Sequence, residues 1–435
     1  MVRRRTVLAT VGAAATGALA GCTSGCSPAV TPSTDPPPDD RPAVWPQPGG
    51  RATKTGRAPP GAAPGDGPDA TTWELWEYTD DDERRGLATA PVVADGRAYV
   101  ATGRPSGWID DPSGRLFALD PDRSDPVWSA PLPDGSGGAP ALADDAVLVT
   151  TRAGDVAAFD RASGDERWRV DVGPPLGTPT VAGGHCYVGD DTGRLTAVDL
   201  AAGAQCRRYS PLATGAAVLG SDRGSLTAPA IEGATAYVAL DAREADDWDE
   251  RGVRIAALDL ESGDVSWYYD AVADGPVRSP AVADGVVYAA TGNALHAIDA
   301  ADGTRRWRFA TGFDETSRPA VADGTVYVSA KNVYALDAAT GAERWRLVNR
   351  AYGTGFSAQK PRQDAPVAAD DRVFVGLGAL DAATGDPLWG EFGSRTESAY
   401  FGSLEREGNL APAGPAVADG AMVATVRMGR VVWFS

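Results

Sequence analysis

Short, mostly apolar runs separated by turn residues follow one another along most of this chain. A representative stretch is PAVADGVVYAATGNALHAID, residues 280–299, in which Asp-Gly and Gly-Asn turns separate the apolar runs. Short apolar runs bounded by such turns predict β-strands. Helical periodicity is nearly absent, so the pattern predicts an all-β fold.

One phrase built from these stretches recurs. It opens with a proline-led strand and closes with a strand-turn-strand unit that reads A-x-D-x-x-x-G-x-x-x-W. The proline strand starts eight times, at Pro91, Pro140, Pro179, Pro229, Pro280, Pro319, Pro366 and Pro415. A period of roughly 40 to 50 residues is typical of a β-propeller or a solenoid.

The closing unit predicts which residues hold the repeats together. We expect each tryptophan to lie on an outer strand and to bury roughly 150 to 250 Å² against the neighbouring repeat. The glycine allows a turn with positive φ, and the aspartate accepts turn amides. Two copies are degenerate, because Ser124 replaces the glycine after Asp120 and Arg207 replaces the tryptophan after Asp199. We assign a structural role to Trp128, Trp168, Trp267, Trp307, Trp345 and Trp389 and to Gly164, Gly203, Gly263, Gly303, Gly341 and Gly385.

The two ends of the repeat array decide between a ring and a solenoid. Residues 429–435 align with 193–199, so the eighth repeat stops after its third strand. An alternating aromatic and acidic run, residues 73–78, precedes the first proline strand and predicts the missing strand. A ring closed by its own N-terminus leaves no terminal edge exposed. We therefore predict an eight-bladed β-propeller of four-stranded repeats, with the last blade closed by the N-terminal strand.

The first 70 residues predict export and a tether. Arg3, Arg4 and Arg5 begin a twin-arginine signal peptide over residues 1–21, and its apolar run is too short to span a bilayer. The quartet Leu-Ala-Gly-Cys at 19–22 is a lipobox, so we expect lipid on Cys22 and anchoring to the outer face of the cytoplasmic membrane. Residues 22–70 are rich in Pro and Gly and predict a disordered tether, and residues 71–435 form the propeller.

Charge and composition indicate the environment in which the protein works. The formal net charge is -19, and Lys54, Lys331 and Lys360 are the only lysines beside many arginines. This bias resembles proteins of extreme halophiles, which indicates a haloarchaeal source. An acidic surface argues against nucleic acid, because phosphate binding needs clustered Lys and Arg.

Cysteine and histidine offer little chemistry by their spacing. Cys186 and Cys206 are predicted to be separated by one strand, roughly 9 to 10 Å, beyond the disulfide reach of about 7 Å. We therefore expect two unpaired, largely buried thiols, and no pair has zinc-ligand spacing. His185 and His296 are expected to be structural or solvated, not catalytic.

The array from Trp73 to Ser435 resembles the quinoprotein-type, or PQQ-like, β-propeller repeat family, whose tryptophan-docking motif it shares. Members of that family include pyrroloquinoline-quinone (PQQ)-dependent alcohol dehydrogenases and non-catalytic lipoproteins such as BamB. The dehydrogenases carry adjacent cysteines and a calcium held by Glu, Asn and Asp, and no such set carries over to this chain. The resemblance thus implies a non-enzymatic, membrane-anchored binding or scaffold module without a cofactor or metal. The alternative is a diverged PQQ-dependent alcohol or sugar dehydrogenase that uses PQQ with calcium.

Loop lengths indicate where a ligand binds. Turns of the Ala-Asp-Gly type are short in nearly every repeat, whereas the connections between second and third strands and between blades vary. In a propeller these two variable classes emerge on one face, which we call the elaborated face; the other is the uniform face. We expect a monomer that binds an unknown protein or extracytoplasmic ligand there. The candidate residues are Trp108, Asp110, Asp111, Trp248, Asp249, Tyr352, Phe356, Lys360, Arg362, Arg395, Tyr400 and Phe401. The acidic loop 244–250 is either a solvated loop or a calcium site.

Overall fold

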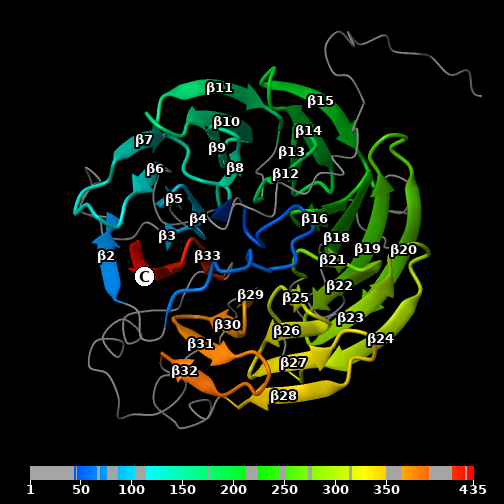
Figure 1. Ribbon diagram of the computed structural model, residues 1–435. Coiled ribbons are helices and arrows are strands. Elements are labelled where there is room, and N and C mark those ends of the chain that lie inside the picture. Colours follow the sequence, from blue (N-terminus) through cyan, green and yellow to red (C-terminus); the bar gives the residue numbers. More distant parts are fainter. Residues whose placement is uncertain are drawn as a thin grey trace, which may run out of the picture.

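Eight antiparallel sheets stand around a central axis in the computed structural model, which forms the predicted eight-bladed β-propeller (Figure 1). The structure describes residues 44–45, 47–65, 69–75, 87–103, 114–173, 177–211, 224–243, 251–272, 277–312, 316–348, 365–390, 414–426 and 429–435. Within these ranges it contains no helix long and apolar enough to cross a membrane.

Each blade has four strands that run in order from the channel to the rim. Blade 1 contains β4 (Val92–Ala94), β5 (Arg97–Gly103), β6 (Gly114–Leu119) and β7 (Trp128–Leu132). Blade 2 contains β8 (Ala141–Ala143), β9 (Ala146–Thr150), β10 (Asp155–Asp160) and β11 (Glu166–Asp171). Blade 3 contains β12 (Thr180–Ala182), β13 (His185–Gly189), β14 (Leu195–Asp199) and β15 (Ala204–Tyr209). Blade 4 contains β17 (Ala230–Glu232), β18 (Thr235–Arg243), β19 (Arg251–Asp259) and β20 (Val265–Val272).

The second half of the ring repeats the arrangement. Blade 5 contains β21 (Ala281–Ala283), β22 (Val286–Thr291), β23 (Ala294–Asp299) and β24 (Arg305–Ala310). Blade 6 contains β25 (Ala320–Ala322), β26 (Thr325–Ser329), β27 (Val333–Asp337) and β28 (Glu343–Leu347). Blade 7 contains β29 (Val367–Ala369), β30 (Arg372–Val375), β31 (Gly378–Asp381) and β32 (Pro387–Trp389). Blade 8 contains β33 (Ala416–Ala418), β34 (Ala421–Val426), β35 (Arg430–Phe434) and β2 (Ala70–Glu74). Three short strands are added, with β1 (Val44–Trp45) on β4, β3 (Leu87–Ala88) on β5 and β16 (Gly224–Leu226) on β18.

The N-terminal strand closes the ring as predicted, although its bounds differ. β2 pairs antiparallel with β35, from Ala70 opposite Phe434 to Glu74 opposite Arg430. Asp69 and Ser435 exchange two main-chain hydrogen bonds of 3.1 Å just beyond this ladder. The expected strand over residues 73–78 was therefore placed too late, because the β-branched pair at 71 and 72 already pairs with the last strand of the chain.

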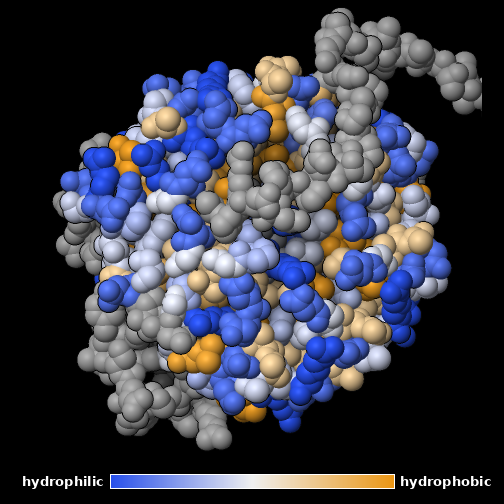
Figure 2. Space-filling model, in the orientation of Figure 1, coloured by the Kyte–Doolittle hydropathy of each residue, from blue (hydrophilic) through white to orange (hydrophobic). Residues whose placement is uncertain are grey.

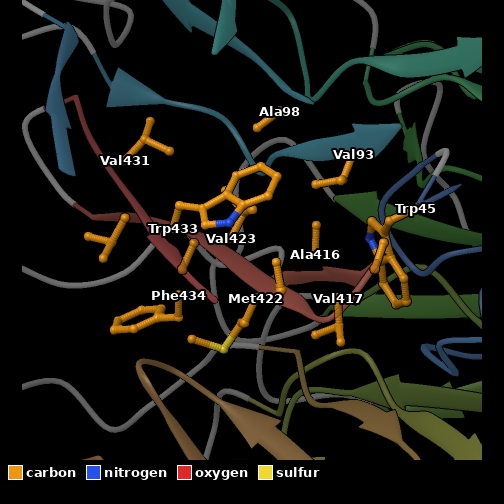
Figure 3. Packing of buried hydrophobic residues seen from close by; sticks show 14 of the residues in the cluster. Trp45, Val93, Ala98, Ala416, Val417, Met422, Val423, Val431, Trp433 and Phe434 are labelled. Atoms are coloured by element: carbon orange, nitrogen blue, oxygen red, sulfur yellow. The ribbon is translucent and has the colours of Figure 1, made fainter. Parts of the chain in front are cut away.

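The core consists of separate clusters between neighbouring blades. The largest cluster joins blades 7, 8 and 1 and includes Trp45, Trp73 and Phe434, all nearly inaccessible to solvent. Figure 3 shows Trp45 beside β33 and, on opposite faces of blade 8, Trp433 with Val423 and Phe434 with Met422. Apolar residues are scattered among polar ones on the face seen in Figure 2. Of the large apolar side chains in the described ranges, Val348 and Leu388 are the exposed ones.

Residues 44–64 correct the predicted tether. We expected disorder through residue 70, yet these residues line the channel and cross the uniform face, and we call them the channel arm. Trp45, Lys54, Ala58 and Ala62 of the arm are all at most 5% exposed. The composition misled the prediction because a segment held by its main-chain groups needs no apolar periodicity. The signal peptide, the lipobox and the rest of the tether lie outside the described residues.

Candidate functional site

The tryptophan motif joins each blade to the next. Trp307 of blade 5 donates its indole N–H to Ala338 O of blade 6 at 2.9 Å, and its ring lies on Gly341. A Cβ atom built on Gly341 would come within 2.6 Å of that ring, and φ at this glycine is 72°. The same glycine contact recurs between Trp128 and Gly164, Trp168 and Gly203, Trp267 and Gly303, and Trp345 and Gly385.

A tyrosine on the second strand completes this joint, and sequence reasoning missed it. Tyr288 contacts Trp307 with ring centroids 5.9 Å apart, and its hydroxyl also donates to Ala338 O, at 3.3 Å. Tyr99 and Tyr327 repeat the contact in blades 1 and 6. The signal was present in the sequence, because a tyrosine follows the Asp-Gly turn in each of these repeats.

The two degenerate positions and the ring closure use variations of the same joint. Arg207 takes the place of the tryptophan in blade 3 and donates to the carbonyls of Leu260, Glu261 and Ser262 beside Gly263. Trp73 of β2 supplies the tryptophan of blade 8 and donates to Arg123 O at 3.1 Å. Closure therefore contributes both a strand and a docking side chain.

The motif aspartates are held by turn amides and by arginines. Asp337 accepts the amides of Ala339 and Thr340 and pairs with Arg344 at 2.9 Å. Hydrogen bonding from Arg344 lowers the pKa of Asp337 to about 2. Arg167 likewise holds the pKa of Asp160 well below its usual value. These carboxylates are ionised turn elements of the uniform face, and their chemistry is structural.

The channel arm is hydrogen-bonded to the innermost strands of six blades. β1 pairs with β4 of blade 1, with Val44 opposite Ala94, and Gln47 binds Val181 of blade 3 through its side-chain amide at 2.9 Å. Main-chain carbonyls of the arm then accept amides of the next four blades in order. These bonds are Ile231 N to Ala52 O at 2.8 Å, Val282 N to Thr53 O at 2.9 Å, Val321 N to Thr55 O at 2.6 Å and Ala368 N to Gly56 O at 2.9 Å.

A lysine stands buried on this arm. Lys54 is 1% exposed, has φ of 58°, and its Nζ has no hydrogen-bond partner in the part of the chain that the structure describes. Burial, reinforced by the charge of Arg318, lowers its pKa well below the ordinary lysine value. Arg318 in turn donates to Lys54 O at 3.4 Å, and burial lowers its pKa to about 10. Both residues escaped the sequence analysis, although Lys54 is one of only three lysines.

Comparison with known proteins agrees with this geometry. The family described as "Outer membrane protein assembly factor BamB" matches residues 68–210, 112–293 and 251–432, overlapping segments that cover nearly the whole ring. The chain belongs to this BamB family of PQQ-like repeats. The family assignment confirms the resemblance that the docking motif indicated.

Solved structures similar to this member of the BamB family share its fold. BamB from Moraxella catarrhalis is 19% identical, has a TM-score of 0.55, and is matched over 84% of this chain and 98% of its own. Quinohemoprotein alcohol dehydrogenase from Comamonas testosteroni is 15% identical, with a TM-score of 0.59 and coverage of 93% and 82%. A segment of 196 residues is 32% identical to the serine/threonine-protein kinase AfsK of Streptomyces griseus; it covers 42% of this chain and 22% of the kinase. The neighbours include binding factors and enzymes, so similarity of fold alone does not decide the function.

The histidines have structural contacts. His296 lies between the Tyr269 hydroxyl and Thr291 Oγ1, each 2.9 Å from one ring nitrogen, and burial lowers its pKa to about 4. It is therefore a neutral, doubly hydrogen-bonded core residue at neutral pH. His185 begins β13, and its Nδ1 lies 2.9 Å from Gly183 O.

Cys206 corrects the cysteine prediction. Cys186 is free and buried as expected, and burial raises the pKa of its thiol to about 12. Cys206 is half-buried and disulfide-bonded. The expectation considered only a bond between Cys186 and Cys206, and these two are indeed not joined.

Within the described ranges, one group has three potential metal ligands close together. His185, Asp199 and Cys206 have ligand atoms within 4.8 Å of one another. Nitrogen and sulfur donors do not suit calcium, which prefers oxygen ligands, and the sulfur of Cys206 is engaged in a disulfide. This group therefore does not fit the calcium that accompanies PQQ.

All predicted candidates of the elaborated face lie outside the described residues. This applies to Trp108, Asp110, Asp111, Trp248, Asp249, Tyr352, Phe356, Lys360, Arg362, Arg395, Tyr400 and Phe401 and to the acidic loop 244–250. The described positions on the same face are the turns between second and third strands, where Ala153, Asp191 and Lys331 are exposed.

Proposed function

We propose that this protein is a non-enzymatic, membrane-anchored extracytoplasmic module that binds a protein partner on its elaborated face. One observation supports the proposal above the others. The repeated aromatic and acidic side chains of the ring are engaged in contacts between or within blades, and the channel holds the protein's own arm. Family membership adds support, because the family carries the description of an assembly factor.

Site-specific photo-crosslinking tests the binding face. A photoreactive residue is placed at Ala153, Asp191 or Lys331, with Asp284 and Asp419 in uniform-face turns as matched exposed controls. In intact cells or native membranes, the first three positions should give one common crosslinked protein that the controls do not give. Equal crosslinking from both faces would contradict the proposal.

The anchor is tested separately. We propose lipid on Cys22 and export by the twin-arginine route from residues 1–21. The Cys22→Ala variant should lose incorporation of labelled lipid and move from the membrane to the released fraction. Membrane retention of that variant without lipid label would exclude this mode of anchoring.

The likeness to quinohemoprotein alcohol dehydrogenase over 93% of the chain keeps a second function testable. In that alternative the protein is a diverged PQQ-dependent alcohol or sugar dehydrogenase. Reconstitution with PQQ and calcium, followed by dye-linked oxidation of alcohols and sugars, distinguishes the two. Stoichiometric retention of PQQ with turnover would replace the binding proposal.

A further inference from the structure

We propose that the central channel is a peptide-binding site, which takes a turn-forming, glycine-containing segment through its main chain and is filled at present by residues 47–58. The inference concerns the inner wall of the ring. It goes beyond the proposed function and does not depend on the elaborated face or on the anchor.

The receptor side of this site repeats from blade to blade. The amide that points into the channel belongs each time to the second residue after the proline that opens the blade. These residues are Val181, Ile231, Val282, Val321 and Ala368, and all five donate to the arm. The innermost strands thus present equivalent donors, one from each blade, around the channel.

The blades recognise the bound segment through its main chain. In blades 4 to 7 the acceptors are backbone carbonyls, which every peptide carries, so side chains matter chiefly through their size. A Cβ atom on Gly56 would lie 2.9 Å from Ala320 Cβ and 3.1 Å from Pro366 O. A Cβ atom on Gly49 would meet Arg318. The site therefore selects a segment with glycine at these two positions.

The arm can leave the channel without opening the ring. Val44 lies opposite Ala94, beside the uniform-face turn of blade 1. Arg57 pairs with Asp323 at 2.8 Å and Gly61 N donates to Asp370, both on uniform-face turns. Both ends of the segment therefore emerge from the same mouth, as a hairpin inserted from one side does.

The arm also carries a buried amine that the channel does not satisfy. Among the described residues Lys54 Nζ has no hydrogen-bond partner, and Lys54 itself has φ of 58°. A buried polar group without a partner disfavours the docked state. The segment thus has the character of a resident ligand and not of a core strand, and a partner segment of the same shape without this lysine would compete with it.

The test starts from the full chain. A protease site replaces residues 65–68, between the arm and β2, and Cys206→Ser removes the disulfide. After cleavage we expect the N-terminal fragment to co-elute with the ring and to exchange with a fluorescent synthetic peptide of residues 43–60. The Gly56→Val peptide should bind at least tenfold more weakly, because its side chain meets Ala320. The Arg57→Gln peptide is the matched control and should bind within about threefold, since exposed ion pairs contribute little.

Failure of the labelled peptide to bind, or equal binding of the Gly56→Val peptide, would overturn the proposal. If the cut ring unfolds, hydrogen exchange on the uncut protein decides. The amides of Lys54 and Gly56, which donate to Arg51 and Gly49 within the arm, should exchange at least a hundredfold faster than those of β22 and β23. Exchange of arm and ring at one common rate would make the arm part of the fold and refute the site.

Discussion

At the scale of single residues, the blade joints depend on glycines that are each covered by the indole of a tryptophan. Gly341 and Gly285 have nearly the same φ, 72° and 69°, but only Gly341 lies under a tryptophan. Nothing lies within 4 Å of a Cβ atom placed on Gly285. The pair therefore separates backbone strain from the loss of a docking contact.

We predict that Gly341→Ala destabilises the protein more than Gly285→Ala. Both should lose about 1 to 2 kcal/mol from the left-handed backbone. Gly341→Ala should lose about 2 kcal/mol more, because the Trp307 indole must move away. Urea denaturation of the two variants beside the parent measures the difference, and equal losses would mean that docking contributes nothing at this joint.

Lys54 gives the fold a dependence on pH. Its pKa is lowered in the folded protein from the ordinary value of 10.5, so the folded state binds fewer protons than the unfolded state. The free energy of unfolding therefore rises with pH between the folded and the unfolded pKa. The Cys186 thiol, with its pKa raised to about 12, works in the opposite direction above about pH 8.5.

In a Cys186→Ala background, Lys54→Met should therefore flatten the rise in stability from pH 6 to pH 9. Arg318, a charged group beside Lys54, has its pKa lowered to about 10 and stays mostly charged up to pH 9. The same change should raise the free energy of unfolding near neutral pH by about 1 to 3 kcal/mol, by removing a buried unpartnered amine. Lys331→Met, at an exposed position, is the control; the same flattening there would contradict the assignment.

Cys206 yields a third residue-scale prediction. Since Cys206 is disulfide-bonded, Cys186 is free and Cys22 is the proposed lipid site, we predict that the partner of Cys206 is Cys26. Peptide mapping without reductant should find Cys206 linked to an N-terminal peptide, and reduction should lower the free energy of unfolding by about 2 to 4 kcal/mol. Detection of Cys206 as a free thiol in unreduced protein would refute the bond.

Sequence and structure agree at the motif residues because these act locally. The Asp, the Gly and the Trp occupy one turn and the strand after it, so their spacing in the sequence predicts their structural roles. Lys54 and Arg318 could not be predicted, because they meet across 264 positions of sequence in a channel that no periodicity describes. The tyrosine of each joint lies between these cases, since it repeats but its partner is in the next blade.

At the scale of elements, the apolar strands of the repeats were predictable and the segments held by main-chain bonds were not. β34 and β35 are mostly apolar, like the corresponding strands of other repeats, and β2 could be inferred from the strand that the eighth repeat lacks. The arm has no such pattern, since its partners are backbone amides and not apolar faces. Trp45, buried against blade 8, was its one apolar signal.

At the scale of the whole molecule, the ring depends on its first 75 residues. We predict that deletion of residues 1–75 exposes the β35 edge and lowers the melting temperature, because β2, the arm and the Trp73 dock are lost together. Deletion of residues 1–43 keeps all three and is the control. Both variants are compared in a Cys206→Ser background by calorimetry and light scattering. A shorter variant as compact and heat-resistant as the control would show that closure is dispensable.

The series of docked indoles gives the ring a weakest point. The Trp389 ring of blade 7 docks on Phe434 of blade 8 and not on a motif glycine, with ring centroids 5.5 Å apart. Within the described ranges of the chain, its buried indole N–H has no acceptor. Under a pulling force or near the melting temperature, the ring should open first at the junction between blades 7 and 8. If the ring opened first at another blade junction, the channel arm at the axis of the ring would be stabilising the junction between blades 7 and 8.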